Sequence, residues 1–424
     1  MICAQDFVVK AGDEKAPGVH NIEKVEKMKR YTVMLLCGIL SMVTAGSPLA
    51  ATGAQTVLAQ AETDETEHAQ KEAPDAPDLP GLTWDHTLPL SYADQFSVDY
   101  YEGGYKLFTI EGDGEYLLVP DGEEAPEDLP DDITVLSHTP QSIYLVATSA
   151  MDFFCGLDAL DAISLSGTNA DGWYIDKAKE ALEDGSISFA GKYSAPDYEQ
   201  ILAAGCDFAI ESTMIYHKPE VKEKLEELGI PVMVEHSSYE SHPLGRTEWV
   251  KLYGALLGKE DEAEALFEEQ ASQLASLENV ESTGKTVAFF YINSMGAANV
   301  RKAGDYVSKM IDLAGGQYIF KDLGADEEGQ STMNMGMEDF YAGAKDADYI
   351  IYNSTIDGEL KSLDELLKKS ALLKDFKAVK EGNVWCLTKS MFQETTCLGD
   401  VIMDMHRMLT EDGPENLTYL YRLE

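Results

Sequence analysis

Short apolar runs alternate with charged, helix-like stretches along most of this chain, and this alternation constrains the fold more than any other feature. Short apolar runs bounded by turn residues are typical of buried strands, and the stretches between them have the spacing of amphipathic helices. Alternation of this kind predicts a parallel sheet with crossover helices. In a first array the expected strands are 133–136, 143–147, 162–165, 206–211 and 230–235, and the expected helices lie near 171–183, 196–204 and 217–228.

A second array of the same kind follows. Its first strand is expected at residues 286–292 (TVAFFYI), because β-branched and aromatic residues favour a buried strand. Further strands are expected near 348–352 and 383–387, and helices near 304–314, 361–372 and 395–410.

A repeated pattern links the two arrays. Glu199 stands near the start of an expected helix, which leads through a small-residue turn into a strand that ends at Ser212 and Thr213. Glu338 stands at the corresponding place before a strand that ends at Ser354 and Thr355. The spacings are not identical, but the order of features is the same. The pattern favours two lobes of similar construction.

Between the arrays lies a long helical pattern, Arg246 to Leu277, interrupted only at Gly258. Its second part has apolar residues at helical spacing and, at 1.5 Å per residue, about 27 Å of length. We therefore predict an α/β fold: two Rossmann-like lobes with central, mainly parallel sheets, joined by a long connecting α-helix. The alternative is an ordinary surface helix of one lobe. The stripe consists of Ala263, Leu266, Phe267, Ala271, Leu274 and Leu277.

The N-terminal part has the composition of a targeting segment. Lys29 and Arg30 precede fifteen uncharged, mostly apolar residues, 31–45, and an A-x-A cleavage site follows at 59–61. We expect the true start at Met28. The expected organisation is an upstream extension with a secretory signal peptide at 1–61, a disordered acidic tether at 62–80, a first α/β lobe with a β-hairpin at 81–245, a connecting helix at 246–279 and a second α/β lobe at 280–424.

Export places the protein at the extracellular face of the cytoplasmic membrane or in the medium. Cys37 lies in the apolar segment, but Leu36 before it is not the small residue that a lipobox requires. We therefore do not expect a lipid anchor at Cys37.

Charge and cysteine usage narrow the function. The chain has 76 acidic and 32 basic residues, a net charge of −44, which argues against nucleic acid because phosphate backbones are bound by clustered Lys and Arg. Four cysteines follow the signal, and we interpret them as buried, unpaired side chains. Disulfides or metal ligands are the alternative. These cysteines are Cys155, Cys206, Cys386 and Cys397.

Several motifs together resemble the class III, helical-hinge substrate-binding proteins of ABC importers, which serve ferric siderophores, haem and cobalamin. They are A-P-D-Y-E-Q-I-L at 195–202, C-D-F-A-I at 206–210, V-K-E-K-L-E-E-L-G-I-P-V at 221–232 and G-K-E-D-E-A-E-A at 258–265. The resemblance covers roughly residues 130–411. It implies a modest closing motion over ligand, and it implies that Glu199 and Glu338 contact arginines of the permease. Stabilisation of helix N-termini is the alternative role for both carboxylates.

In open α/β sheets, ligands bind at the carboxyl ends of the strands. Tyr and His side chains there are suited to haem iron, and arginines to siderophore or propionate oxygens. The alternative is a polar, hydrogen-bonded lobe edge. The expected ligand-binding residues are Ser149, Thr168, Trp173, Tyr193, Thr213, Tyr216, His217, His236, Tyr239, Arg246, Met295, Arg301 and Met391.

These features predict a monomeric, exported binding protein that delivers a ferric siderophore, haem or a cobalamin-like ligand to an ABC permease and has no intrinsic cofactor. An importer protein for a bare transition metal, with ligands from His217, His236 and His242, is the first alternative. A secreted α/β hydrolase is the alternative of a different class, but we find no G-x-S-x-G or H-E-x-x-H motif and no Walker loop. A surface adhesin is the third.

Overall fold

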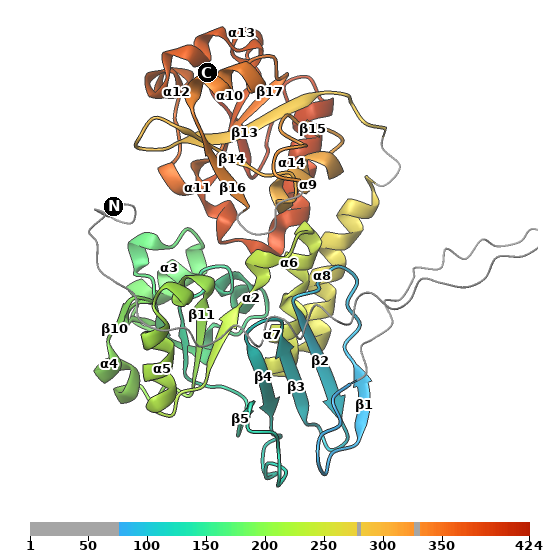
Figure 1. Ribbon diagram of the computed structural model, residues 1–424, viewed down its shortest axis with the longest axis vertical. Coiled ribbons are helices and arrows are strands. Elements are labelled where there is room, and N and C mark those ends of the chain that lie inside the picture. Colours follow the sequence, from blue (N-terminus) through green and yellow to red (C-terminus); the bar gives the residue numbers. More distant parts are fainter. Residues whose placement is uncertain (1–75, 278–280, 326–330) are drawn as a thin grey trace, which may run out of the picture. The chain divides into compact units, whose positions relative to one another are not determined.

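The computed structural model describes residues 76–277, 281–325 and 331–424, which belong to one compact unit. The expected signal peptide, Cys37 and residues 62–75 of the expected tether lie outside these residues. The end of that segment is not disordered, because Leu79 is buried against Tyr101 and Leu107. Three large sheets and one two-stranded sheet organise the described chain. One large sheet is parallel throughout and another has a parallel centre, with helices between their strands (Figure 1). The predicted α/β class is confirmed. The exact domain boundaries stay predictions.

The first lobe contains a five-stranded sheet in the order β12-β11-β6-β7-β8, with every pairing parallel. The strands are β6 (Ile143–Leu145), β7 (Ile163–Ser166), β8 (Ser188–Phe189), β11 (Phe208–Ser212) and β12 (Val232–Glu235). A short hairpin, β9 (Gly191–Lys192) and β10 (Ala195–Pro196), stands beside it. Four of the five strands predicted for this lobe are therefore confirmed within a residue or two.

Helices connect these strands, as the alternation predicted. They are α2 (Met151–Gly156), α3 (Asp176–Glu183), α4 (Tyr198–Ala203) and α5 (Pro219–Glu227), and 3-10 helices span Leu160–Ala162, Ala170–Gly172, Thr213–His217 and Ser237–Tyr239. Ile201 of α4 and Val221 and Leu225 of α5 pack with Ala209 and Val232 in one buried cluster. Figure 1 shows α4 and α5 beside β11.

The second lobe contains a seven-stranded sheet whose centre is parallel and whose edges are antiparallel. Its path is β16-β14-β13-β17-β18-β19, and β15 pairs with β13. The strands are β13 (Thr286–Ile292), β14 (Ala298–Arg301), β15 (Gln317–Tyr318), β16 (Thr332–Met335), β17 (Tyr349–Tyr352), β18 (Val384–Leu387) and β19 (Leu420–Arg422). The three predicted strands form the parallel centre, whereas the antiparallel edge strands β14, β16 and β19 were not predicted.

The helices of this lobe are α9 (Tyr306–Leu313), α10 (Met337–Ala344), α11 (Ser354–Asp357), α12 (Leu363–Lys369), α13 (Lys377–Glu381) and α14 (Leu398–Thr410), with 3-10 helices at Ala371–Asp375, Lys389–Phe392 and Thr395–Cys397. The predicted helices near 304–314, 361–372 and 395–410 are confirmed to within a few residues as α9, α12 and α14, and α10 begins at the expected position of Glu338, whereas α11 and α13 were not predicted. Among the described residues, no helix has both the length and the apolar character that a membrane span requires.

The segment between the lobes forms three helices rather than one: α6 (Pro243–Glu248), α7 (Val250–Leu257) and α8 (Glu260–Ala275). The predicted break at Gly258 is confirmed, because Gly258 adopts φ 68° and ends α7 in a left-handed turn. A Cβ on Gly254 of α7 would stand 2.4 Å from the Cβ of Ala263, so the missing side chain lets α8 pack closely on α7. The long connecting helix is therefore α8, which packs against α14 of the second lobe.

A third sheet precedes the first lobe, and we call it the accessory sheet. It has the order β1-β2-β3-β4-β5, antiparallel except for the parallel pair β4 and β5. Its strands are β1 (Trp84–Thr87), β2 (Phe96–Tyr101), β3 (Lys106–Ile110), β4 (Gly114–Leu118) and β5 (Ile133–Leu136). The predicted hairpin is β3 and β4 of this sheet. The prediction that 133–136 belongs to the parallel sheet of the first lobe was wrong, because β5 pairs with β4.

Two buried carboxylates hold the accessory sheet to the central helices. Glu248 of α6 accepts hydrogen bonds from the backbone N–H groups of Ser91, Tyr92 and Ala93 at 2.7–2.8 Å. Glu240 accepts them from the N–H groups of residues 94 and 95 and from the indole of Trp249. Because buried carboxylates are costly unless hydrogen-bonded, these contacts fix the 91–95 loop on α6 and α7.

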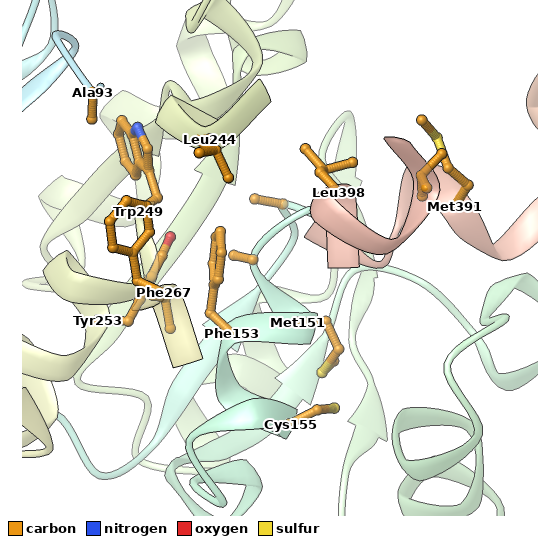
Figure 2. Close-up of a cluster of buried hydrophobic side chains, with 14 of the residues drawn as sticks. Ala93, Met151, Phe153, Cys155, Leu244, Trp249, Tyr253, Phe267, Met391 and Leu398 are labelled. Carbon is orange, nitrogen blue, oxygen red and sulfur yellow. The ribbon is translucent and has the colours of Figure 1, made fainter. Parts of the chain in front are cut away.

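One continuous apolar core runs through the accessory sheet, the central helices and both lobes. Figure 2 shows Phe153 of α2 beside Tyr253 of α7, and their rings stack at 5.2 Å. Met151 of α2 and Leu398 of α14 belong to the same cluster. The two lobes therefore share buried apolar contacts as well as the helix α8.

Candidate functional site

Polar side chains gather where three neighbouring strands of the first lobe end. Ser149 follows β6, and its hydroxyl donates to a carboxylate oxygen of Glu235 at 2.8 Å. Glu235 is the last residue of β12, and its other oxygen accepts from the N–H of Ser237 at 3.0 Å. Parallel strands end at the same edge of a sheet, which brings these residues together. Ser149 lies at the sheet edge where we expected it, and its role in ligand binding stays a prediction.

A second hydrogen-bonded group stands beside it. Tyr216 lies in the 3-10 helix after β11, and its hydroxyl is 2.6 Å from Nε2 of His236, which follows β12. Nδ1 of His236 is 2.7 Å from the carbonyl oxygen of Glu111, between β3 and β4 of the accessory sheet. His236 is only 2% exposed, whereas Tyr216 and Tyr239 are 45% and 53% exposed. The two tyrosines therefore present aromatic surface over a buried imidazole.

The turn that provides this carbonyl is firmly held. Asp113 accepts from the N–H of Val234 at 2.9 Å and from the hydroxyl of Tyr116 at 2.6 Å, and it pairs with Nζ of Lys222 at 3.2 Å. Its side chain is almost fully buried. The turn between β3 and β4 is thus attached to strand β12 and helix α5.

An arginine without a polar partner stands on α6. The guanidinium of Arg246 lies 4.2 Å from the ring centroid of Tyr306 on α9, and the side chain forms no hydrogen bond or ion pair with any residue of the described chain. Arg246 is 9% exposed. Arg301 approaches the same ring at 5.9 Å and pairs with Asp305 at 3.3 Å. Two guanidinium groups therefore share one aromatic ring, but a single carboxylate pairs with them.

The histidine that precedes α6 is electrically neutral in this setting. His242 accepts from the N–H of Leu244 and stacks on Tyr92 at 4.6 Å. Burial lowers the pKa of His242 to about 4, and Lys309 of α9 contributes. Positive charge near this end of α6 thus comes from Arg246 and Lys309 rather than from the imidazole.

Residues 393–396, which we call the clasp, join the second lobe to the first. The side-chain amide of Gln393 accepts from the N–H of Tyr174 at 2.7 Å and donates to the carbonyl of Gly172 at 2.9 Å. Thr395 donates to the carbonyl of Ser149, and Thr396 bonds Asp152. Burial raises the pKa of Asp152, while the hydrogen bonds from Thr396 oppose that rise.

Two of the predicted ligand-binding residues, Trp173 and Met391, lie in the buried core. Trp173 is buried, and its indole N–H donates to the carbonyl of Thr168 at 3.1 Å. Met391 is buried in the core shared by the lobes (Figure 2). Trp173 and Met391 therefore belong to the apolar core.

The remaining predicted residues are more accessible. Met295 is 81% exposed in the turn between β13 and β14, and His217 is exposed beside Tyr216. Thr213 and Tyr193 are partly exposed, the latter packed against the first-lobe cluster. The structure thus brings together Ser149, Tyr216, His236 and Tyr239 at one sheet edge, with Arg246 and Arg301 at Tyr306 as a second group.

Across the described ranges, no group of three His, Cys, Asp or Glu side chains converges as metal ligands do. His217, His236 and His242 therefore do not form the three-ligand site that the bare-metal alternative requires. Each cysteine that the structure describes is free; Cys155 and Cys386 are buried as we expected, whereas Cys206 and Cys397 are only partly buried.

The two carboxylates expected to contact a permease occupy equivalent positions. Glu199 is the second residue of α4, which precedes β11, and Glu338 is the second residue of α10, which precedes β17. Both side chains are exposed. An apolar or aromatic residue follows each by one helical turn, Leu202 and Tyr341.

Comparison with known proteins places the chain among binding proteins. The family model described as periplasmic binding protein matches residues 157–391. An uncharacterized lipoprotein of Methanocaldococcus jannaschii is 27% identical over 352 residues, which is 76% of this chain and 81% of the relative. A second uncharacterized lipoprotein of that organism is 24% identical over 78% of this chain and 86% of the relative. These names conflict with our expectation against a lipid anchor, and we withdraw it.

Solved structures show the same fold. A periplasmic heme binding protein from Pseudomonas aeruginosa aligns over 67% of this chain and 98% of its own, with a TM-score of 0.52 and 17% identity. The petrobactin-binding protein of Bacillus subtilis aligns over 65% and 93%, with a TM-score of 0.52 and 13% identity. A periplasmic binding protein from Veillonella parvula aligns over 64% and 92%, with a TM-score of 0.52 and 18% identity.

Proposed function

Because the chain belongs to the periplasmic binding protein family, we propose that it is the substrate-binding component of an ABC importer, and that it captures an anionic iron complex outside the cytoplasm. A ferric siderophore or haem is the proposed ligand class, and a cobalamin-like ligand is the next candidate. The heme and petrobactin proteins that share the fold support this class. We propose that the protein binds its ligand without chemical turnover.

The observation that carries the ligand class is the unpaired Arg246. Arg246 is largely buried as a residue, but its guanidinium nitrogens are not among the buried polar atoms that lack a partner, so they remain accessible to solvent or a ligand. In a chain of net charge −44, carboxylates are abundant, yet none pairs with this side chain among the described residues. Stacking on Tyr306 at 4.2 Å holds the guanidinium in place and leaves its N–H groups for an incoming anion. Carboxylate or catecholate oxygens of an iron chelate are suited to this role, because arginine binds planar anions in a bidentate manner.

The structure favours a metal that arrives within a chelate over a bare metal ion. A bare transition metal needs three or four converging protein ligands, and no group of three gathers among the described residues. A chelate or porphyrin brings most of its iron ligands with it, so one or two protein contacts suffice. Tyr216 at the exposed edge is the residue that we propose for such a contact.

We propose that helices α4 and α10 contact the permease during delivery. We propose that Glu199 and Glu338 form charge-assisted pairs with permease arginines, one from each lobe. Their equivalent placement before β11 and β17 supports this role, because a two-fold partner needs two matching contacts. We propose that the protein acts as a monomer on this partner.

Retention at the membrane is a further part of the proposal. The lipoprotein names of two relatives support a lipid anchor, and Cys37 is the single cysteine between Met28 and Ala61. Metabolic labelling with a fatty acid analogue tests this directly. Label that disappears in Cys37→Ala identifies the anchor, and equal label in both proteins excludes Cys37.

A thermal-shift screen tests the ligand class. Haemin, ferric siderophores and cyanocobalamin are compared with the iron-free siderophores and with Zn²⁺ and Mn²⁺ alone. A ligand at 100 times its dissociation constant adds about 2.7 kcal/mol to the free energy of unfolding. Stabilisation by an iron complex but not by its iron-free form supports the proposal. Stabilisation by a bare metal alone, or hydrolysis of test esters, refutes it.

A further inference from the structure

The accessory sheet lies outside the residues that match the family. Its strands span residues 84–136, and the match covers 157–391. Nevertheless the sheet contacts the candidate site, because the carbonyl of Glu111 in the turn between β3 and β4 bonds His236. Which group donates and which accepts in the series Glu111, His236, Tyr216 indicates what the contact does.

The donor and acceptor in each hydrogen bond are fixed by the preceding bond, starting from the Glu111 carbonyl. A carbonyl oxygen only accepts, so Nδ1 of His236, at 2.7 Å from the oxygen of Glu111, carries the proton. In the neutral imidazole, Nε2 then has no proton and accepts. Tyr216 at 2.6 Å from Nε2 must therefore donate its hydroxyl proton to the ring.

The phenol of Tyr216 retains that proton in the empty protein. Burial raises the pKa of Tyr216 to about 12, and the charge of Asp113 and the neighbouring Tyr239 contribute. Since the single proton is directed at His236, the lone pairs of the phenol oxygen remain for the ligand. At the exposed edge, the oxygen of Tyr216 is consequently an acceptor and not a donor.

We propose that the accessory sheet is a positioning element of the binding site: through the Glu111 carbonyl and His236 it fixes Tyr216 as an acceptor, so the ligand group that meets Tyr216 is a hydrogen-bond donor or a metal centre. The proposal rests on the proposed function for the identity of the site. It assigns a role to a sheet that the family match does not include, and it makes Glu111 and His236 positioning residues rather than ligand contacts.

Asp113 gives access to this chain of contacts without touching Tyr216 or His236. Its carboxylate holds the turn to Val234, Tyr116 and Lys222. Removing the carboxylate in Asp113→Ala frees the turn, and with it the carbonyl that orients His236. The effect on ligand binding is then expected to pass through Tyr216.

A double-mutant cycle measures that dependence. Haemin and a ferric siderophore are titrated against the wild type, Asp113→Ala, Tyr216→Phe and the double variant. We expect Tyr216→Phe, which removes the acceptor, to reduce the affinity for the probe about tenfold. Asp113→Ala, which removes the contacts that hold the turn, is expected to reduce it about fivefold. In the Tyr216→Phe background, Asp113→Ala is expected to have no further effect. Independent, multiplicative losses overturn the proposal.

A control and a second readout separate this proposal from general destabilisation. Thr87→Ala removes the hydrogen bond to Asp99 in the same sheet, away from the turn, and is expected to leave probe affinity unchanged. Nitrogen-15 NMR of the imidazole is expected to show a protonated Nδ1 in the wild type and an altered signal in Asp113→Ala. If no probe binds, the proposed function fails and the NMR result alone decides the positioning role: a protonated Nε2 in the wild type refutes it.

Discussion

Thr396 donates two hydrogen bonds to one carboxylate oxygen of Asp152, from its backbone N–H at 2.8 Å and from its hydroxyl at 2.5 Å. Asp152 belongs to α2 of the first lobe, and Thr396 lies between β18 and α14 of the second. Both side chains are largely buried. This pair, together with Gln393, makes the clasp a polar attachment between the lobes within an otherwise apolar interface.

Removing the acceptor is expected to weaken the clasp. In Asp152→Ala, the N–H and hydroxyl of Thr396 lose their buried partner, and we expect the free energy of unfolding to fall by about 3 kcal/mol. Chemical denaturation measures the change. Asp161→Ala is the matched control, because Asp161 is exposed nearby, and it is expected to change stability by less than about 0.5 kcal/mol. Equal effects of the two substitutions contradict the attachment.

Arg246 is expected to affect ligand binding more than stability. Arg246→Gln keeps a polar side chain but removes the charge, and we expect the affinity for an anionic iron complex to fall at least tenfold, or about 1.4 kcal/mol. Because Arg246 has no ion pair among the described residues, the loss of stability is expected to be small. Calorimetric titration at two salt concentrations measures the affinity, and a loss of salt dependence in Arg246→Gln attributes the effect to the charge of the guanidinium.

Arg407 provides the comparison for Arg246. It pairs with Glu411 on the surface, at 3.1 Å, away from the candidate site. Arg407→Gln is expected to leave ligand affinity unchanged, since an exposed ion pair contributes little. A tenfold loss in Arg407→Gln as well would attribute the effect to net charge and not to the Arg246 site.

Glu199 and Glu338 are expected to affect transport and not ligand binding. Charge reversal in Glu199→Arg or Glu338→Arg places a positive charge opposite the permease arginines, and we expect uptake to fall about tenfold or more for each. Ligand affinity is expected to stay at the wild-type value, because both carboxylates are exposed on helices outside the candidate site. Glu180→Arg on α3, also on the surface, is the control. Uptake that is unaffected by both substitutions excludes the docking role.

The parallel parts of both sheets were predictable because each strand is a continuous apolar run between amphipathic helices. Residues 286–292 and 349–352 are buried along nearly their whole length. Such strands are recognised as continuous apolar runs, without an alternation of apolar and polar residues. The antiparallel edge strand β16, TMNM, has no such signal, since it is half exposed and pairs only with β14. The run 133–136 was predicted as a strand but assigned to the wrong sheet, because nothing local specifies the pairing partner.

The candidate site was predictable only where it follows the ends of strands. Ser149, Tyr216 and His236 could be placed because the carboxyl ends of parallel strands meet. Glu111, Tyr306 and Gln393 were missed, since their roles depend on contacts with distant segments. Gln393, for example, bonds residues about 220 positions earlier in the chain, a relation that no periodicity encodes. The two Thr residues after Glu394 were the available signal, as a polar run between a strand and a helix.

Glu211 presents an unusual buried carboxylate. It is the fourth residue of β11, it is fully buried, and neither of its side-chain oxygens has a hydrogen-bond partner among the described residues. Burial raises its pKa from 4.5 to about 8, and Lys222 only partly opposes this. At neutral pH the folded protein therefore holds a protonated Glu211.

This protonation makes stability depend on pH in a defined direction. Between pH 4.5 and about 8 the unfolded chain releases the proton of Glu211 while the folded chain keeps it, so the free energy of unfolding falls as pH rises through that window. Glu211→Gln cannot ionise and is expected to remove up to about 4 kcal/mol of that decline. Denaturation at pH 5 and pH 8 measures the difference. Glu235→Gln, one strand away, is the control: Glu235 accepts hydrogen bonds from Ser149 and Ser237, so its substitution is expected to lower stability at both pH values. A pH profile that Glu211→Gln leaves unchanged shows that Glu211 is already ionised in the folded protein.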